Sequence, residues 1–183
     1  MTNLRRGERQ DLVVDAAMRA FGRTGYFGTT TGEIAREAGI SQGYVIHLFG
    51  SKETLFLAAL RRAGDAIVDQ MRRIGLDEFD LSRFAPIYGR TALDRTVMAM
   101  LMQGFAACSL DAVAAYVRTL LAEMYAVLVD TTGASPEEAR DYLARGLLVN
   151  VVLAMGLPEH ADPDGWAKPL LEALSGSGAV RDD

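Results

Sequence analysis

The side chains best suited to chemistry in this sequence are hydrogen-bonding groups between Thr30 and His47, rather than nucleophiles or metal ligands. The chain has two histidines, His47 and His160, and one cysteine, Cys108, and none of them has metal-ligand spacing. Neither a phosphate-binding glycine loop nor a nucleophile elbow is present. A single cysteine also excludes an intramolecular disulfide. The sequence therefore predicts a protein that is not an enzyme and that carries no metal and no cofactor.

The polar groups between Thr30 and His47 follow the pattern of two short helices and a tight turn. Thr30-Thr31-Gly32-Glu33 is a capping-box sequence, which predicts a helix over residues 31–38. Gly39 can take positive φ in the turn, and Ser41 can cap a helix over residues 42–48. This is a helix-turn-helix pattern. The spacing places four residues on the outward face of its second helix: Gln42, Gly43, Tyr44 and His47. An ordinary helical hairpin with a solvated polar face has the same pattern.

The helices that must position these groups are predicted from apolar spacing. Residues 9–23 repeat apolar side chains at i, i+4, with Leu12 and Phe21 on the buried face and Gly22 and Gly25 ending the helix. Further helices are predicted over residues 51–75, 90–108, 111–131, 136–155 and 163–174, so the expected fold is all-α. We divide the chain into a head, residues 1–50, and a body, residues 51–183, with residues 51–75 as a connecting helix.

Charge is distributed unevenly along the chain. Residues 1–62 hold nine Lys or Arg against six Asp or Glu, whereas residues 63–183 hold ten against eighteen, which gives the net charge of −5. A basic end on an acidic chain favours contact with phosphates at that end, although an excess of three is weak evidence by itself. No apolar run reaches the roughly 18–20 residues of a membrane span. We expect a cytoplasmic protein without a membrane partner.

The segment 34–55, IAREAGISQGYVIHLFGSKETL, resembles the DNA-binding head of the TetR family of transcriptional regulators, and GYFGTTT before it resembles the lead into the second helix of that head. The resemblance covers about the first 60 residues. It implies an N-terminal three-helix helix-turn-helix domain and a C-terminal helical bundle that dimerises. It also implies a regulator, most often a repressor, which binds a near-palindromic double-stranded DNA operator as a homodimer and is released by a small-molecule ligand.

The resemblance assigns DNA contacts to Thr30, Thr31, Ser41, Gln42, Gly43, Tyr44, His47 and Lys52. Hydroxyls and amides at the helix starts would meet phosphates, as would Lys52, a mobile point charge. Gln42 can pair with adenine, and Tyr44 can reach a thymine methyl or a phosphate. Arg5 and Arg6 fit either a minor-groove arm or a solubilising tail.

The head also departs from the family pattern. Ile46 and Leu48 stand where the family often has phosphate-binding Tyr or His. We therefore expect a weaker grip on phosphates. Because the recognition helix has no Arg or Lys, we also expect A·T pairs at the contacted steps.

The body carries two further predictions. Apolar residues around the circumference of two helices predict a dimer interface that includes Tyr116, Leu120, Met124, Leu147 and Val151, with a larger monomeric bundle as the alternative. Methionine, aromatic and polar side chains could line a pocket for a small apolar or amphipathic ligand, or could be plain core: Phe84, Tyr88, Met98, Met102, Phe105, Tyr125, Asn150 and Trp166. The alternative function is a helical dimeric module for small molecules or protein partners with a degenerate DNA-binding head.

Overall fold

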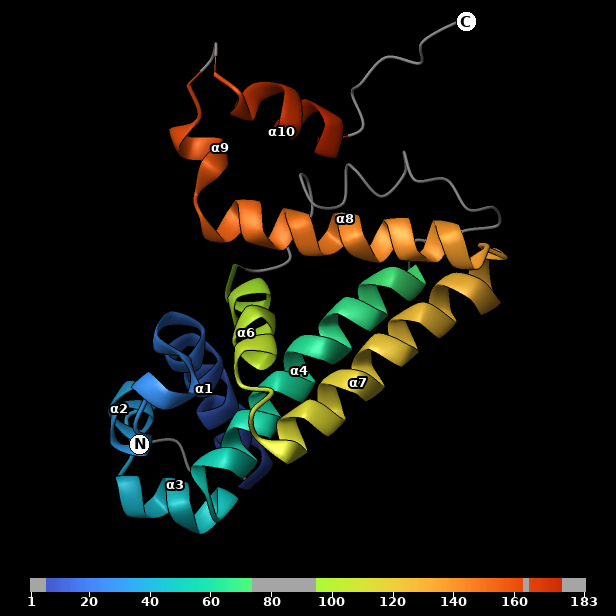
Figure 1. Ribbon diagram of the computed structural model, residues 1–183. Helices are drawn as coiled ribbons and strands as arrows, with labels where there is room; N and C mark the ends of the chain where they lie inside the picture. The colour runs from blue at the N-terminus through green and yellow to red at the C-terminus, as the bar shows by residue number, and fades with distance from the viewer. Residues whose placement is uncertain (1–5, 74–94, 163–164, 176–183) are drawn as a thin grey trace, which may run out of the picture. The chain divides into compact units, whose positions relative to one another are not determined.

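The computed structural model describes residues 6–73, 95–162 and 165–175, and every regular element in these ranges is a helix (Figure 1). The expected all-α fold is confirmed. The chain divides into two compact units, one formed by residues 1–69 with 96–121 and the other by residues 70–95 with 122–183. The first unit extends beyond the predicted head of residues 1–50, because it also includes parts of three later helices.

The first unit is built around a buried aromatic and aliphatic core. Its helices are α1 (Arg6–Gly28), α2 (Thr31–Glu37), α3 (Gln42–Phe49), most of α4 (Lys52–Arg73), α6 (Arg95–Ala106) and most of α7 (Asp111–Ala126). The rings of Phe21 and Phe56 meet edge to face, with centroids 4.9 Å apart. Ile34, Leu55 and Leu60 are fully buried with them. The core therefore joins α1, α2 and α4, the three helices that position α3.

Glycines in α1 allow α6 to approach closely. Gly22 lies inside the helix, where an added Cβ would be 3.3 Å from the Ala99 side chain. Gly25 has φ 72°, and a Cβ there would be 2.6 Å from Oε1 of Gln103. The helix is interrupted at Gly25 but continues to Gly28. The prediction that Gly22 ends the helix was wrong, since Gly22 allows close packing, whereas the predicted break at Gly25 is present as a kink with non-helical backbone angles.

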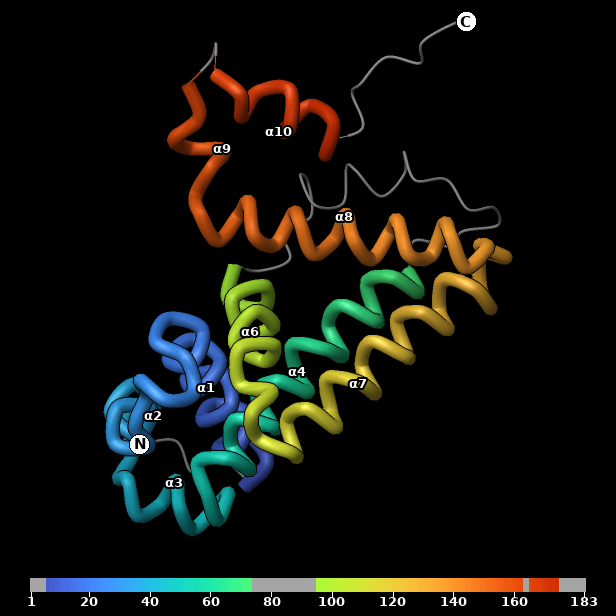
Figure 2. Tube along the Cα trace, in the orientation of Figure 1, coloured from blue at the N-terminus to red at the C-terminus, as the bar shows by residue number. Residues whose placement is uncertain are grey.

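The second unit contains the end of α7, a π-helical turn (Val127–Thr131), α8 (Pro136–Ala154), α9 (Leu157–His160) and α10 (Ala167–Ser175). Figure 2 follows the chain from the π-helical turn into α8 and on to α10. The sequence Ser135-Pro136-Glu137-Glu138 is a capping box, and Ser135 caps α8: its hydroxyl accepts from the Glu138 amide at 3.2 Å, and its own amide donates to Glu138 at 2.8 Å. The Arg145 guanidinium donates to the carbonyl oxygens of Ala173, at 3.3 Å, and Leu174. These bonds hold the last turn of α10 to α8.

The continuous helix of residues 111–131 is long and apolar enough to cross a membrane, with a mean hydropathy of 1.5 in its most apolar window. Length and composition alone are weak evidence, because the core helix of a soluble protein passes the same test. Val113 and Leu120 on this helix are buried inside the first unit. The absence of a membrane partner stays a prediction.

Candidate nucleic-acid interface

The start of α2 is fixed by the predicted capping box. Thr30 Oγ1 accepts a hydrogen bond from the Glu33 amide at 3.2 Å, and the Thr30 amide donates to Glu33 Oε2 at 2.7 Å. The Thr30 hydroxyl also donates to the same carboxylate at 2.9 Å. These bonds lower the pKa of Glu33, because they stabilise its charged form. The Thr30 hydroxyl thus has both a donor and an acceptor within the head, so a phosphate would compete with Glu33 for it.

The turn and the start of α3 also follow the sequence prediction. Gly39 has φ 68°, which ends α2, and the Ser41 hydroxyl accepts from the Tyr44 amide at 3.2 Å. Gln42 Nε2 donates to Thr31 Oγ1 at 3.0 Å, which joins the first turns of α2 and α3. Two of the residues assigned to DNA are therefore paired with each other and lie side by side.

The exposed side of α3 carries the predicted residues. Gln42, Gly43 and His47 are exposed and Tyr44 is half-buried, whereas Val45 is 1% exposed and points into the core. Ile46 is 40% exposed on this helix. The prediction that Leu12 on α1 is buried behind α3 was wrong, since Leu12 is 48% exposed. It borders a surface hollow between α1 and the turn rather than the core.

Lys52 opens α4 and is held more firmly than the sequence predicted. Its Nζ donates to the carbonyl oxygens of Tyr26, at 2.9 Å, and Thr29, at 3.2 Å, and lies 4.3 Å from the Tyr26 ring centroid. The description of Lys52 as a mobile point charge was therefore wrong. Its ammonium has one further N–H for a phosphate. Ser51 caps α4, with its hydroxyl accepting from the Thr54 amide at 3.0 Å.

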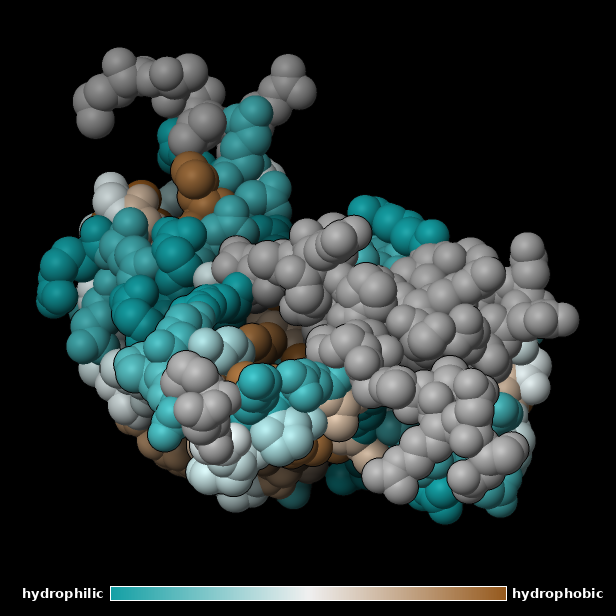
Figure 3. All heavy atoms as spheres, turned by 90° about the horizontal axis from the view of Figure 1, so that it is seen from above, coloured by the Kyte–Doolittle hydropathy of each residue, from teal (hydrophilic) through white to brown (hydrophobic). Residues whose placement is uncertain are grey.

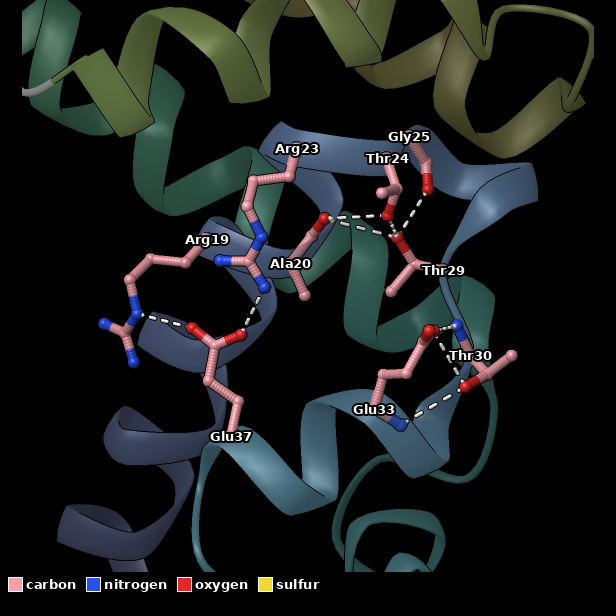
Figure 4. A network of polar contacts seen from close by, with 9 residues as sticks. All are labelled: Arg19, Ala20, Arg23, Thr24, Gly25, Thr29, Thr30, Glu33 and Glu37. Carbon is pink, nitrogen blue, oxygen red and sulfur yellow. Dashed lines mark hydrogen bonds and ion pairs between the residues drawn. The ribbon is translucent and has the colours of Figure 1, made fainter.

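Sequence reasoning missed the polar network that ties the end of α1 to α2 (Figure 4). Thr29 is 1% exposed, and its hydroxyl bonds the Gly25 carbonyl at 2.7 Å and the Thr24 hydroxyl at 2.7 Å. Glu37 accepts from Arg19 at 2.7 Å and from Arg23 at 2.6 Å. The bond from Arg23, followed by that from Arg19, lowers the pKa of Glu37. This network fixes the segment from which Thr30 and α2 begin, but nothing local in the sequence pairs Glu37 with two arginines of α1.

The proposed ligand-binding residues are divided between the two units. Met98 is buried, Met102 is half-buried and Phe105 is exposed on α6 of the first unit. In the second unit Tyr125 is 39% and Trp166 68% exposed, while Asn150 is buried. Phe84 and Tyr88 lie outside the described residues. Among the described residues, the Asn150 Oδ1 atom has no hydrogen-bond partner. A shared pocket for this set stays a prediction.

The proposed dimer residues have different environments. Leu120 is 5% exposed, and both Leu120 and Tyr116 pack on Gly64 of α4, which leaves room for them. The Tyr116 hydroxyl donates to the Arg61 carbonyl at 3.5 Å. Both side chains thus contact α4 of their own chain, and their part in a dimer interface stays a prediction. Met124 is half-buried, and Leu147 and Val151 are 42% and 40% exposed on α8.

Comparison with known proteins supports the interpretation of the head. The sequence model of the family described as "Bacterial regulatory proteins, tetR family" matches residues 13–59. The HTH-type transcriptional regulator BetI of Rhizobium meliloti is 47% identical over 53 residues, or 29% of this chain. BetI of Brucella melitensis is 43% identical over 61 residues. The chain spans only 26% and 29% of the length of these two relatives.

Solved structures extend the likeness to the helical body. A TetR-like transcriptional regulator from Rhodococcus sp. RHA1 covers 94% of this chain and is itself covered to 96%, with a TM-score of 0.65 and 22% identity. The multidrug binding protein EbrR complexed with imidazole aligns with 91% of this chain over 89% of its own length, with a TM-score of 0.61 and 23% identity. At such identities the likeness shows the fold alone. The head, over residues 13–59, therefore matches the tetR family of bacterial regulatory proteins, and the chain as a whole has the fold of these regulators.

Proposed function

We propose that this protein is a transcriptional regulator that acts as a repressor: it binds a near-palindromic double-stranded DNA operator as a homodimer and is released by a small apolar or amphipathic ligand. The observation that carries the proposal is the exposed face of α3, where Gln42, Gly43 and His47 face solvent on a helix fixed by the Ser41 cap. The N-terminal residues of such a helix contact base edges in the major groove. Such an activity belongs in the cytoplasm, where bacterial DNA lies.

The residues around α3 suit a DNA duplex. Lys52 is positioned by two carbonyl oxygens beside the end of α1, and it keeps one N–H for a phosphate. Gln42 donates one N–H to Thr31 and keeps the second N–H and its carbonyl oxygen, which are the two groups that pair with adenine. The A·T preference expected from the sequence is part of this proposal.

The apolar face of α8 supports the homodimer. We define the α8 face as Leu147, Leu148, Val151 and Met155, which are 40–58% exposed and are spaced as one side of a helix. Figure 3 shows apolar side chains, in brown, at the surface between polar ones. An apolar stripe on one helix favours cover by another protein surface, and twofold symmetry would let the α8 face cover its own copy.

Asn150 supports a ligand with a hydrogen-bond donor. Its Oδ1 atom is buried and has no partner in the part of the chain that the structure describes, which is costly unless a bound group satisfies it. EbrR has been solved in complex with imidazole and with proflavin, both of them nitrogen-containing ring compounds. We propose that ligand binding tilts α4 and so changes the spacing of the two heads, which shifts operator affinity by about 1–3 kcal/mol.

Selection of bound fragments from a random DNA pool tests the function directly. We expect the selected DNA to hold two inverted half-sites about one helical turn apart, with A·T pairs at the contacted steps and affinity that falls steeply with salt. A Gln42→Ala variant should relax the preference at one base pair per half-site, whereas Lys52→Met should weaken binding to all sequences equally. Failure of the wild-type chain to enrich any sequence would contradict the proposal.

Loss of DNA binding in that experiment would favour the second candidate function. Ile46 is 40% exposed on α3, where it offers a phosphate no hydrogen bond. This favours a dimeric module for small molecules or protein partners whose head no longer binds DNA. The wild-type chain would then dimerise and bind a ligand but would retain no DNA from the pool.

A further inference from the structure

We infer that Arg9 of α1 is a positioning residue for Tyr44, and that it commits the Tyr44 hydroxyl to donate a hydrogen bond to an acceptor on DNA. This inference rests on the proposed function and adds Arg9, a residue to which no sequence pattern assigns a role. Arg9 NH1 lies 3.3 Å from the Tyr44 hydroxyl oxygen, and the guanidinium carbon lies 5.8 Å from the ring centroid. The two residues are 35 positions apart, so only the fold brings them together.

The direction of this hydrogen bond follows from the groups involved. A guanidinium carries donors and no acceptor, so the Tyr44 oxygen must accept from Arg9. The phenol proton is then left to be donated elsewhere. Only an acceptor can receive it: a phosphate oxygen, or an acceptor on a base edge such as thymine O4 or adenine N7. A thymine methyl, which the sequence left open as a target for Tyr44, gains nothing from this arrangement.

Tyr44 needs such a contact because packing alone does not fix its side chain. A hollow of about 440 Å³ lies between α1 and the turn, and both Arg9 and Tyr44 line it together with Leu12 and Ile40. Tyr44 is only half-buried, so its ring has room to move on that side. The Ser41 cap holds the Tyr44 amide, whereas Arg9 holds the hydroxyl at the far end of the side chain. The His47 ring lies 6.2 Å from that of Tyr44 at an interplanar angle of 28°, so the same contact also orders the neighbouring exposed residue.

A double-mutant cycle on DNA affinity tests this role. The probe is the DNA that the wild-type chain selects from a random pool, and the variants are Arg9→Met, Tyr44→Phe and the pair together. Each single variant should bind the DNA about tenfold more weakly than wild type. The double variant should show the same loss of about tenfold, because both changes remove the same donated hydrogen bond. Arg9→Lys keeps the charge and one donor and should lose less than Arg9→Met. If the Arg9→Met chain does not fold, Arg9→Lys takes its place in the cycle.

Arg36→Met in α2 is the matched control, because it removes one positive charge from an exposed position of the same head. When Arg36→Met is combined with Tyr44→Phe, the loss of DNA affinity should equal the product of the two single losses, as expected for an independent, long-range charge effect. If Tyr44 donates to a phosphate, both Arg9→Met and Tyr44→Phe will weaken all sequences equally. If it donates to a base, both will relax the preference at the same base pair.

Two results would overturn the inference, and they are distinguishable. In the first, the wild-type chain binds DNA, but the loss of affinity in the double variant equals the product of the losses in Arg9→Met and Tyr44→Phe. The two residues would then act independently, and the proposed function would stay intact. A wild-type chain that selects no DNA would overturn the proposed function and this inference together.

Discussion

Buried polar groups have different surroundings in the two units. In the first unit Thr29 is 1% exposed, and its hydroxyl has partners on Thr24 and Gly25 of the same unit. In the second unit Asn150 is 8% exposed, and its Oδ1 atom has no partner among the described residues. A unit that satisfies its own buried polar groups can fold without a ligand, whereas one that leaves an amide oxygen unsatisfied is stabilised by whatever binds there.

Exposed apolar residues show the same difference. In the first unit they are scattered over separate helices, such as Leu12 on α1 and Ile46 on α3, which is ordinary for a protein surface. In the second unit the α8 face gathers four of them on one side of one helix. The first unit thus offers mainly polar groups to a partner, and the second offers an apolar surface.

The largest effect is expected in the core of the first unit. Phe21→Ala should lower the free energy of unfolding by about 3–5 kcal/mol, because it leaves a cavity against Phe56. Thermal and denaturant unfolding measure this change. Phe27→Ala is the matched control: Phe27 is 71% exposed, and its truncation should cost less than about 1 kcal/mol. Equal losses from the two variants would contradict the described core.

The next effect concerns association rather than folding. Leu147→Glu combined with Val151→Glu should raise the dimer dissociation constant by at least about 100-fold, because both charges would be buried on the α8 face. Sedimentation velocity over a concentration series measures the change. Phe27→Glu makes the same kind of change on the first unit and should leave the dimer intact. A wild-type chain that is monomeric at all concentrations would refute the proposed interface.

A smaller effect tests whether α7 packs on its own chain. Gly64→Ala should destabilise the protein by about 1–3 kcal/mol, because the added Cβ would lie 2.3 Å from the Tyr116 hydroxyl and 2.9 Å from a methyl carbon of Leu120. Gly43→Ala is the control, since open space surrounds a Cβ there and alanine favours a helix by up to about 1 kcal/mol. Chemical denaturation separates the two. A neutral Gly64→Ala would mean that Tyr116 and Leu120 are free to face a second chain.

Local features of the fold could be predicted from the sequence. The capping boxes at Thr30 and Ser135 and the positive φ of Gly39 each depend on residues within four positions, and the structure confirms all three. The role of Gly22 could not be predicted, because it makes room for the side chain of Ala99, which is 77 positions away in the sequence. The packing of Leu120 on α4 could not be predicted for the same reason, because helical spacing shows that a residue is apolar on one side but not which helix covers it.

The candidate site divides in the same way. Sequence placed Gln42, Gly43 and His47 on the exposed side of α3, and the structure agrees. The contacts that orient the site join distant helices: Lys52 with the end of α1, and Arg9 with Tyr44. No periodicity or cap connects such pairs. The sequence prediction therefore treated Lys52 as mobile, which it is not, and assigned no role to Arg9.

The smallest expected effect is a pH dependence of the polar network in the first unit. Hydrogen bonds from Arg23 and Arg19 lower the pKa of Glu37 from the ordinary value of 4.5, so they stabilise the fold above that pH, and this stabilisation is lost as the pH falls through the lowered value. Glu37→Gln should therefore be less stable than wild type at neutral pH, by less than about 1 kcal/mol, since both arginines are largely exposed and solvent screens them. The difference should shrink as the pH falls below 4.5. Thermal unfolding across this range measures it, and a difference that did not vary with pH would mean that the Glu37 charge has no part in holding α2 to α1.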